Sequence, residues 1–231
     1  MGLKEDLEEN VADIFQSYWD ETNGTVVPDA EDVALEGNEG INLDTTVLYA
    51  DLSGSTDLVD RKDKTFAAEI YKTFLLCAAK VIRSEDGEVT AYDGDRVMAV
   101  FIGKQKNTSA VRTALKINWA VRNIIRPAQM AQYPDDDYVL KHVVGVATSK
   151  LMAARTGVRG DNDLVWVGKA ANHAAKLNSL PDTHTTYITE AVYDAMLETV
   201  KTSKGTSMWE RVRWGFNNSI IYRSTWMWEL D

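Results

Sequence analysis

Residues 45–56 have the sequence TTVLYADLSGST, and this stretch indicates how the chain folds. Its first half is rich in β-branched and aromatic residues, which favour a strand. The strand is expected to end at Asp51, because the small polar residues that follow are typical of a turn and of a helix N-terminus. The stretch therefore predicts a strand that enters a tight turn and a helix that leaves it.

A hairpin is the second clear signal. The apolar runs 88–92 and 96–102 flank Asp93-Gly94, and this dipeptide is typical of a tight β-hairpin turn. A helix with apolar periodicity is predicted at 64–83, between the first strand and this hairpin. The two apolar runs are therefore predicted to pair with each other as the strands of this hairpin.

The second half of the chain mixes helices and strands. A long helix is predicted at 108–132, and an alanine-rich helix is predicted over 172–177. Further predicted segments are a strand at 138–148, a glycine-rich polar link at 155–163, a strand at 164–167 and a tryptophan-rich hairpin at 208–230. Because these elements do not follow a regular β-α-β rhythm, the predicted class is α+β.

The N-terminal residues form a separate pattern. Apolar residues recur at spacings of three and four from Leu3 to Trp19, which predicts an amphipathic helix. The acidic stretch 23–42 is typical of a connector. We therefore divide the chain into a helix with an acidic connector, residues 1–43, and one domain, residues 44–231.

Composition excludes several classes of function. The chain has 231 residues, and 25 lysines and arginines against 35 acids give a net charge of −10, so nucleic-acid polymers are not expected partners. Cys77 is the single cysteine, which excludes an internal disulfide and a thiolate metal cluster. The acidic start does not match a signal peptide, and no apolar run approaches the ~20 residues of a membrane span. We therefore expect a cytoplasmic protein that is not bound to a membrane.

Two aspartates are candidates for metal binding. Asp51 lies at the exit of the first strand, and Asp95 lies beside the hairpin turn. If the hairpin pairs with the first strand, both carboxylates reach the same end of the sheet. Hard oxygen ligands of this kind suit Mg²⁺ or Mn²⁺ when phosphates complete the coordination.

At this point the sequence resembles the class III nucleotidyl cyclases. Residues 49–56, YADLSGST, resemble the family's Phe-Ala-Asp-Ile-x-Gly-Phe-Thr segment, and residues 94–101, GDRVMAVF, resemble its Gly-Asp-Gly-x-Met-Ala-x-Phe hairpin. Residues 168–177, GKAANHAAKL, resemble Gly-x-x-Val-Asn-x-Ala-x-Arg-Leu. The resemblance runs from about Thr46 to Leu177 and more loosely through the C-terminal hairpin. It implies a ferredoxin-like catalytic domain, in which helices flank a mostly antiparallel central sheet and a helical extension precedes it.

The resemblance also implies the roles of individual residues. Asp51, Asp95 and the Leu52 carbonyl would hold two divalent cations, Mn²⁺ or Mg²⁺. Asn172 would orient the ribose, and Lys176, where the family usually has arginine, would stabilise charge on the α-phosphate. The backbone amides of residues 53–56 would receive the β- and γ-phosphates. The expected substrate-binding residues around these positions are Tyr49, Ser53, Gly54, Ser55, Thr56, Ala91, Tyr92, Val165 and Trp166.

In this family the metal ligands come from one chain and the asparagine and basic residue from the other. This chain has both sets, which implies a homodimer with two shared active sites. A non-catalytic nucleotide-binding or dimerisation module is the alternative from another functional class.

The base is expected to be a pyrimidine. The family reads purines at the residue four before the second metal aspartate and at the residue seven before the asparagine, which are Ala91 and Val165 here. Neither side chain can form a hydrogen bond, and Tyr92, Trp166 or Arg96 could fill the space beside a smaller base. This pattern is similar to the bacterial pyrimidine cyclases of the Pycsar antiphage systems, which implies conversion of UTP to 3′,5′-cyclic UMP and pyrophosphate. A separate effector would then read the product. Synthesis of cyclic CMP remains an alternative, and a purine cyclase is a more distant one.

Overall fold

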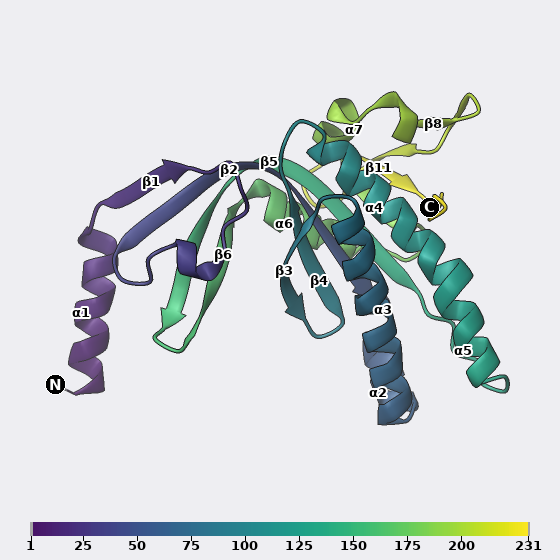
Figure 1. Cartoon of the computed structure of the whole chain (residues 1–231), viewed down its shortest axis with the longest axis horizontal. Helices are drawn as coiled ribbons and strands as arrows, with labels where there is room; N and C mark the ends of the chain where they lie inside the picture. The colour runs from purple at the N-terminus through teal and green to yellow at the C-terminus, as the bar shows by residue number, and fades with distance from the viewer. Residues whose placement is uncertain (1, 231) are drawn as a thin grey trace.

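A curved sheet of nine strands forms the centre of the molecule, in a computed structural model that describes residues 2–230 (Figure 1). Its main path is β10-β11-β7-β5-β2-β4-β3, while β1 pairs with β2 and β6 pairs with β5. Neighbouring strands are antiparallel except in the pairs β1–β2 and β5–β7. The predicted α+β class is therefore confirmed, with a mixed sheet.

The strands of this sheet are β1 (Trp19–Asn23), β2 (Asn38–Leu52), β3 (Glu88–Asp93), β4 (Arg96–Phe101), β5 (His142–Val158), β6 (Asp161–Gly168), β7 (Thr186–Thr189), β10 (Glu210–Arg213) and β11 (Ile220–Ser224). A separate small ribbon consists of β8 (Thr202–Ser203) and β9 (Thr206–Ser207). The helices are α1 (Leu3–Gln16), α2 (Ser55–Arg61), α3 (Lys64–Ser84), α4 (Lys106–Ala120), α5 (Arg126–Gln132), α6 (Lys169–Asn178) and α7 (Glu190–Ala195). A π-helical turn at Val121–Ile125 joins α4 to α5, and short 3₁₀ turns lie at Ala30–Asp32 and Glu198–Val200. Within residues 2–230, no helix has the length and apolarity needed to cross a lipid bilayer.

The two faces of the sheet bury different sets of side chains. On β2, Leu48 and Ala50 pack into the large cluster formed with α3 and α4. Val47 and Tyr49 point the other way, to a smaller cluster that includes the α6 alanines. Successive side chains of a strand point to opposite faces, so α3 and α6 cover opposite faces of the sheet.

A glycine lets α6 approach the sheet closely. Gly145 pairs with Tyr49 in the centre of the sheet, and a Cβ atom at this position would meet the carbonyl oxygen of Ala174. The same atom would lie 2.6 Å from the backbone nitrogen of Asn178. Glycine within a strand often marks such a close approach of another backbone.

The structure differs from the sequence-based expectations in two places. The acidic connector contains β1 and the start of β2, so the expected boundary between residues 43 and 44 falls inside β2. The glycine-rich link at 155–163 is the far end of a hairpin, because β5 extends to Val158 and β6 begins at Asp161. Both segments are largely polar, and strands at a sheet edge need no continuous apolar pattern because water covers much of their surface.

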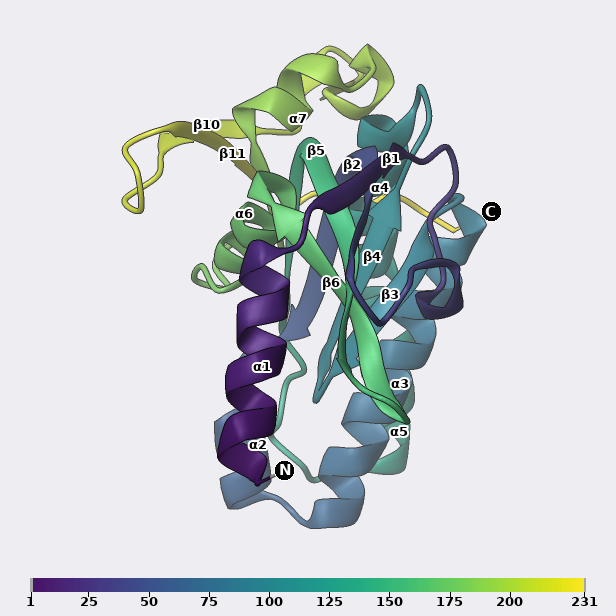
Figure 2. The same ribbon diagram turned by 90° about the vertical axis from the view of Figure 1, so that its left-hand side faces the viewer.

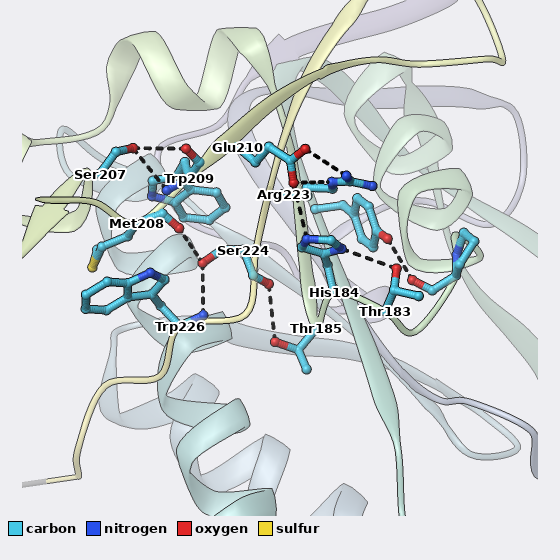
Figure 3. Close-up of polar contacts among 12 residues, drawn as sticks. Thr183, His184, Thr185, Ser207, Met208, Trp209, Glu210, Arg223, Ser224 and Trp226 are labelled. Atoms are coloured by element: carbon cyan, nitrogen blue, oxygen red, sulfur yellow. Dashed lines mark hydrogen bonds and ion pairs between the residues drawn. The ribbon is translucent and has the colours of Figure 1, made fainter.

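The C-terminal hairpin is fixed by polar contacts (Figure 3). Arg223 on β11 donates from Nε and Nη2 to the Glu210 carboxylate on β10, at 2.9 and 2.8 Å. Ser224 Oγ donates to the Met208 carbonyl oxygen at 2.6 Å. The tail beyond the hairpin lies along α4, where Asn118 donates its side-chain amide to the carbonyl oxygens of Thr225 and Trp226.

Candidate active site

The strand register brings Asp51 and Asp95 together at one end of the sheet. The antiparallel pairing of Ala50 with Val97 places Asp51 level with Arg96, the residue after Asp95. Burial raises the pKa of Asp51 to about 6, and the negative charge of Asp95 is the second cause. Arg96 and the side chain of Asn178 act in the opposite direction. The side chains therefore form a like-charge pair that is costly without a cation.

This pair fits a divalent cation. The Oδ2 atom of Asp95 is buried and has no hydrogen-bond partner within residues 2–230. The backbone of Leu52 follows Asp51 at the end of β2, so its carbonyl belongs to the same edge. In the described part of the chain, no group of three or more acidic, histidine or cysteine side chains is arranged to hold a metal ion by itself. Two carboxylates with open positions suit Mg²⁺ or Mn²⁺ when substrate phosphates supply further oxygens.

Two tyrosines that we did not predict lie beside the aspartates. Burial raises the pKa of Tyr71 on α3, the nearby charges of Asp95 and Asp51 raise it further, and a hydrogen bond with Ser55 opposes them. Burial, Tyr71 and Asp95 raise the pKa of Tyr138 to about 12, and its buried hydroxyl has no partner within residues 2–230. Both hydroxyls are therefore neutral donors beside the two aspartates. Nothing in the sequence around either residue signalled this role, since Tyr71 lies within an amphipathic helix and Tyr138 follows three aspartates.

The turn after Asp51 offers fewer phosphate donors than we expected. The backbone N–H of Ser53 donates to the carbonyl oxygen of Lys141 at 2.9 Å, and the Ser53 hydroxyl donates to Asp182 at 2.9 Å. The Ser53 amide therefore has a partner within the chain, and its contact with a phosphate stays a prediction. Gly54 has a left-handed backbone with φ of 75° and precedes α2. The other predicted phosphate-binding residues, Gly54, Ser55 and Thr56, lie at the start of α2. The first backbone amides of a helix have no carbonyl acceptor within that helix.

Asn172 and Lys176 lie one turn apart on the exposed face of α6. A surface pocket of about 710 Å³ runs past both residues and past Arg96, Trp214 and Phe216. The Lys176 ammonium lies 4.4 Å from the centre of the Phe216 ring, which is a cation–π contact. The C-terminal hairpin therefore helps to position the predicted phosphate-binding lysine, a role that the sequence did not reveal.

Arg96 connects this pocket with the sheet end that carries Asp51 and Asp95. Its guanidinium donates to Asp93 at 2.6 Å and lies 5.4 Å from the centre of the Tyr49 ring. Its Nε atom is buried and has no hydrogen-bond partner within the described residues. The Nε atom of Arg96 is therefore an unused donor in the residue next to Asp95, and the Tyr49 ring lies beside the guanidinium.

The residues expected near the base lie on different surfaces. Ala91 and Trp166 pack against the cluster on the α6 face, as Tyr49 does. Val165 points to the other side of β6 and is 40% exposed. Tyr92 lines a groove along α3, because an irregularity between Val89 and Ala91 shifts the register of β3. Within one chain, Ala91 and Trp166 thus share a face with α6, whereas Tyr92 does not.

The three arginines of the C-terminal hairpin have partners within the chain. Arg211 lies 3.7 Å from the Glu190 carboxylate, and Arg213 donates to Asn218. Arg223 pairs with Glu210, as described above. None of the three lines the pocket beside Lys176.

Comparison with known proteins identifies the family. No family model matches the chain. The sequence is 56% identical to a uridylate cyclase from Xanthomonas perforans and 52% identical to a uridylate cyclase from Burkholderia cepacia, each over all of both chains. A uridylate cyclase from Rhodovulum sp. (strain MB263) is 33% identical over 98% of this chain and 97% of its own.

Solved structures share the fold. The adenylyl cyclase CyaB from P. aeruginosa matches with a TM-score of 0.69 at 20% identity, over 80% of this chain and 95% of that chain. The guanylyl cyclase Cya2 matches with a TM-score of 0.67 at 16% identity, over 82% and 95%. With this fold and with relatives that match along its whole length, the chain belongs to the uridylate cyclase family of class III nucleotidyl cyclases.

Proposed function

We propose that this chain is a uridylate cyclase that converts UTP to 3′,5′-cyclic UMP and pyrophosphate. The observation that carries the proposal is the meeting of Asp51 and Asp95 at one sheet end, with an orphaned buried carboxylate oxygen. The naming of the full-length relatives as uridylate cyclases supports the choice of base. In the reaction the ribose 3′-hydroxyl gives its proton to solvent, and its oxygen forms a bond to the α-phosphorus. The bond between the α-phosphorus and its bridging oxygen breaks, and pyrophosphate leaves.

Asp51, Asp95 and the Leu52 carbonyl are the residues that would hold the two divalent cations. When bound, these cations neutralise the triphosphate and lower the pKa of the ribose 3′-hydroxyl. Because the pKa of Asp51 is raised to about 6, the metal-free pair keeps a proton below about pH 6, and cation binding in that range releases it. The hydroxyls of Tyr71 and Tyr138 are placed to donate hydrogen bonds to oxygens at the same edge.

On α6, Asn172 is proposed to orient the ribose and Lys176 to stabilise charge on the α-phosphate. Lysine keeps the positive charge of the family's arginine but lacks its planar pair of donors. The Phe216 ring restricts the ammonium, which offsets part of the flexibility of the lysine side chain.

The active sites are proposed to be shared within a homodimer, with the aspartates from one chain and α6 from the other. Mixing an Asp51→Ala chain with an Asn172→Ala chain tests this arrangement. Neither variant should be active alone, and the mixture should recover activity because one site of each mixed dimer is intact. A mixture that stays inactive, although mixed dimers form, would show that the sites are not shared.

The base is proposed to be uracil, and the surroundings of Ala91 and Trp166 support a pyrimidine. Ala91 and Val165, at the two positions where the family reads purines, have no side-chain hydrogen-bonding group, and Ala91 and Trp166 face the α6 side. Incubation of the pure protein with Mn²⁺ and each of the four nucleoside triphosphates, followed by product separation, tests the substrate. Cyclic UMP should be the main product. A preference for CTP would assign the cytidylate alternative, and a preference for ATP or GTP would contradict the pyrimidine proposal.

Pyrophosphate release separates catalysis from mere nucleotide binding. It should require both the divalent cation and Asp95, so Asp95→Ala should abolish release while the fold remains. Binding of UTP without any release by the wild-type dimer would favour a non-catalytic binding module.

We further propose that cyclic UMP made by this chain is a messenger in antiphage defence and that a separate effector reads it. The resemblance to Pycsar cyclases supports this role. Cells that carry the chain and its effector should resist infection, whereas cells with the Asp51→Ala variant should not. Equal resistance with the inactive variant would refute a role for the product.

A further inference from the structure

The N-terminal helix α1 has an apolar face that nothing in the described chain covers. Leu3, Leu7, Val11 and Ile14 follow one another at helical spacing and are each more than half exposed. No residue of α1 is buried. An amphipathic helix gains most of its stability from burying such a face, so this face requires a partner.

Hydrogen bonds anchor α1 at its C-terminal end. The side-chain amide of Asn38 donates to the carbonyl oxygens of Ile14 and Ser17, at 2.8 and 3.0 Å. These bonds fix the C-terminal end of α1 to the start of β2. Figure 1 shows that α1 projects from the sheet on the left, apart from α3, which covers one face of the sheet near β3 and β4. In Figure 2, which views the molecule from that side, α1 lies in front.

A groove along the outer side of α3 has complementary properties. Its volume is about 820 Å³, and its apolar part includes Leu75, Leu76 and Tyr92. Its rim carries Lys72, Lys80 and Arg83, and none of these three forms an ion pair within residues 2–230. The groove therefore offers apolar surface and free positive charge.

Charge and length match between the helix and the groove. Helix α1 has five acidic residues and one lysine, while α3 has four basic residues and one glutamate in a chain of net charge −10. At 1.5 Å per residue, α1 is about 20 Å long, which is close to the stretch of α3 between Glu69 and Arg83. If two copies of α1 packed on each other, the five acidic residues of each copy would come together, and these like charges would repel each other.

We propose that α1 of one copy binds in the α3 groove of a second copy, and that the exchange is reciprocal about a two-fold axis. This contact rests on the homodimer proposed above but does not depend on the chemistry at its active sites. Helix α3 also carries Tyr71, so the exchanged helix would brace the element that lies behind Asp51 and Asp95.

Cross-linking between two different variants tests the contact. Both chains carry Cys77→Ala, which removes the native thiol, and one chain has Leu7→Cys while the other has Leu76→Cys. A short bismaleimide should join the two chains when they are mixed, and each variant alone should give little product. Cross-linking of Leu7→Cys chains to each other would show that α1 pairs with α1, and the absence of any mixed product would overturn the proposal.

The dissociation constant of the dimer, measured by analytical ultracentrifugation, provides an independent readout. Leu7→Asp should raise the dissociation constant about a hundredfold, because two buried leucines are lost per dimer. Val26→Asp, at a side chain that is also exposed but lies outside α1, is the matched control and should leave it unchanged. Lys80→Glu with Arg83→Glu should weaken the dimer, and Glu8→Lys with Glu9→Lys should restore it in part. A dissociation constant unchanged by Leu7→Asp would contradict the proposal.

The outcomes separate this contact from the proposed function. If mixed Asp51→Ala and Asn172→Ala chains recover activity but no mixed cross-link forms, the shared sites stand and the α1 contact fails. If the cross-link forms while all four nucleotides remain unconverted, the contact stands and the proposed chemistry fails.

Discussion

Gly145→Ala should push α6 away from the sheet while Asp51 and Asp95 stay in place. The added Cβ would lie 2.6 Å from the Asn178 nitrogen and 2.9 Å from Leu177 Cβ, whereas ordinary contacts begin at 3.4 Å. The helix must therefore move by about 0.8 Å or more. Overpacking of this kind costs about 1–3 kcal/mol of the free energy of unfolding. A displacement near 1 Å at Asn172 and Lys176 should lower kcat about a hundredfold.

Stability is measured by urea denaturation and activity by pyrophosphate release. Gly40→Ala is the matched control, because its Cβ would meet only the flexible thioether side chain of Met152 rather than a backbone. The control should lose little stability and little activity. Wild-type activity of Gly145→Ala would refute the argument that α6 needs this close approach.

Mixing experiments then locate the defect within the proposed shared site. Gly145→Ala still supplies both aspartates, so mixing it with Asp51→Ala should restore about a quarter of wild-type activity, since half of the dimers are mixed and each has one intact site. Mixing it with Asn172→Ala should restore none, because both chains then lack a working α6. Rescue by both partners, or by neither while the variant stays folded, would contradict a specific effect on α6.

Three further predictions concern charges and stability. Burial and the nearby Arg126 and Arg122 lower the pKa of His142 to about 3. Below pH 6.5 the unfolded state therefore binds more protons than the folded state, and the free energy of unfolding should decrease as the pH is lowered, by about 2 kcal/mol at pH 5. His142→Phe should remove this part of the pH dependence in urea titrations at pH 7 and pH 5, and an unchanged slope would contradict it. Phe216→Ala should lower kcat about two- to fivefold by freeing Lys176, whereas Phe216→Tyr, which keeps the ring, should not; equal rates for both variants would exclude the cation–π contact as a cause. Because the pKa of Asp51 is raised to about 6, its charge destabilises the metal-free protein increasingly as pH rises from 3.8 to 6. In EDTA at pH 8, Asp51→Asn should therefore gain about 1–2 kcal/mol of stability after allowance for solvent screening, and a loss of stability would refute this.

The sequence predicted the elements whose signals are local. Asp93-Gly94 marked the hairpin, and the polar turn after Asp51 marked the start of α2, because turn geometry depends on the few residues within the turn. The spacing of Asn172 and Lys176 predicted that both lie on one face of a helix, and α6 places them there. The strand β1 was missed because its pairing depends on β2, and its own exposed residues carry no apolar alternation.

The candidate site was predictable only where a motif carried it. Asp51 and Asp95 were identified from their motifs, and their proximity followed once the hairpin paired with the first strand. Tyr71, Tyr138 and Phe216 reach the site from separate segments, so no local pattern in the sequence joins them to it.

By itself, the sequence determined the α+β class, the aspartate and asparagine positions, and the family that they indicate. Only the tertiary structure decided which of those groups meet, because side-chain direction depends on strand register and on which face of the sheet each helix covers. It placed Trp166 rather than Val165 on the α6 face and turned Tyr92 to the groove along α3. The net charge of −10 could be counted from the sequence, but only the fold gathered Asp51 and Asp95 at one edge and the free basic side chains along α3.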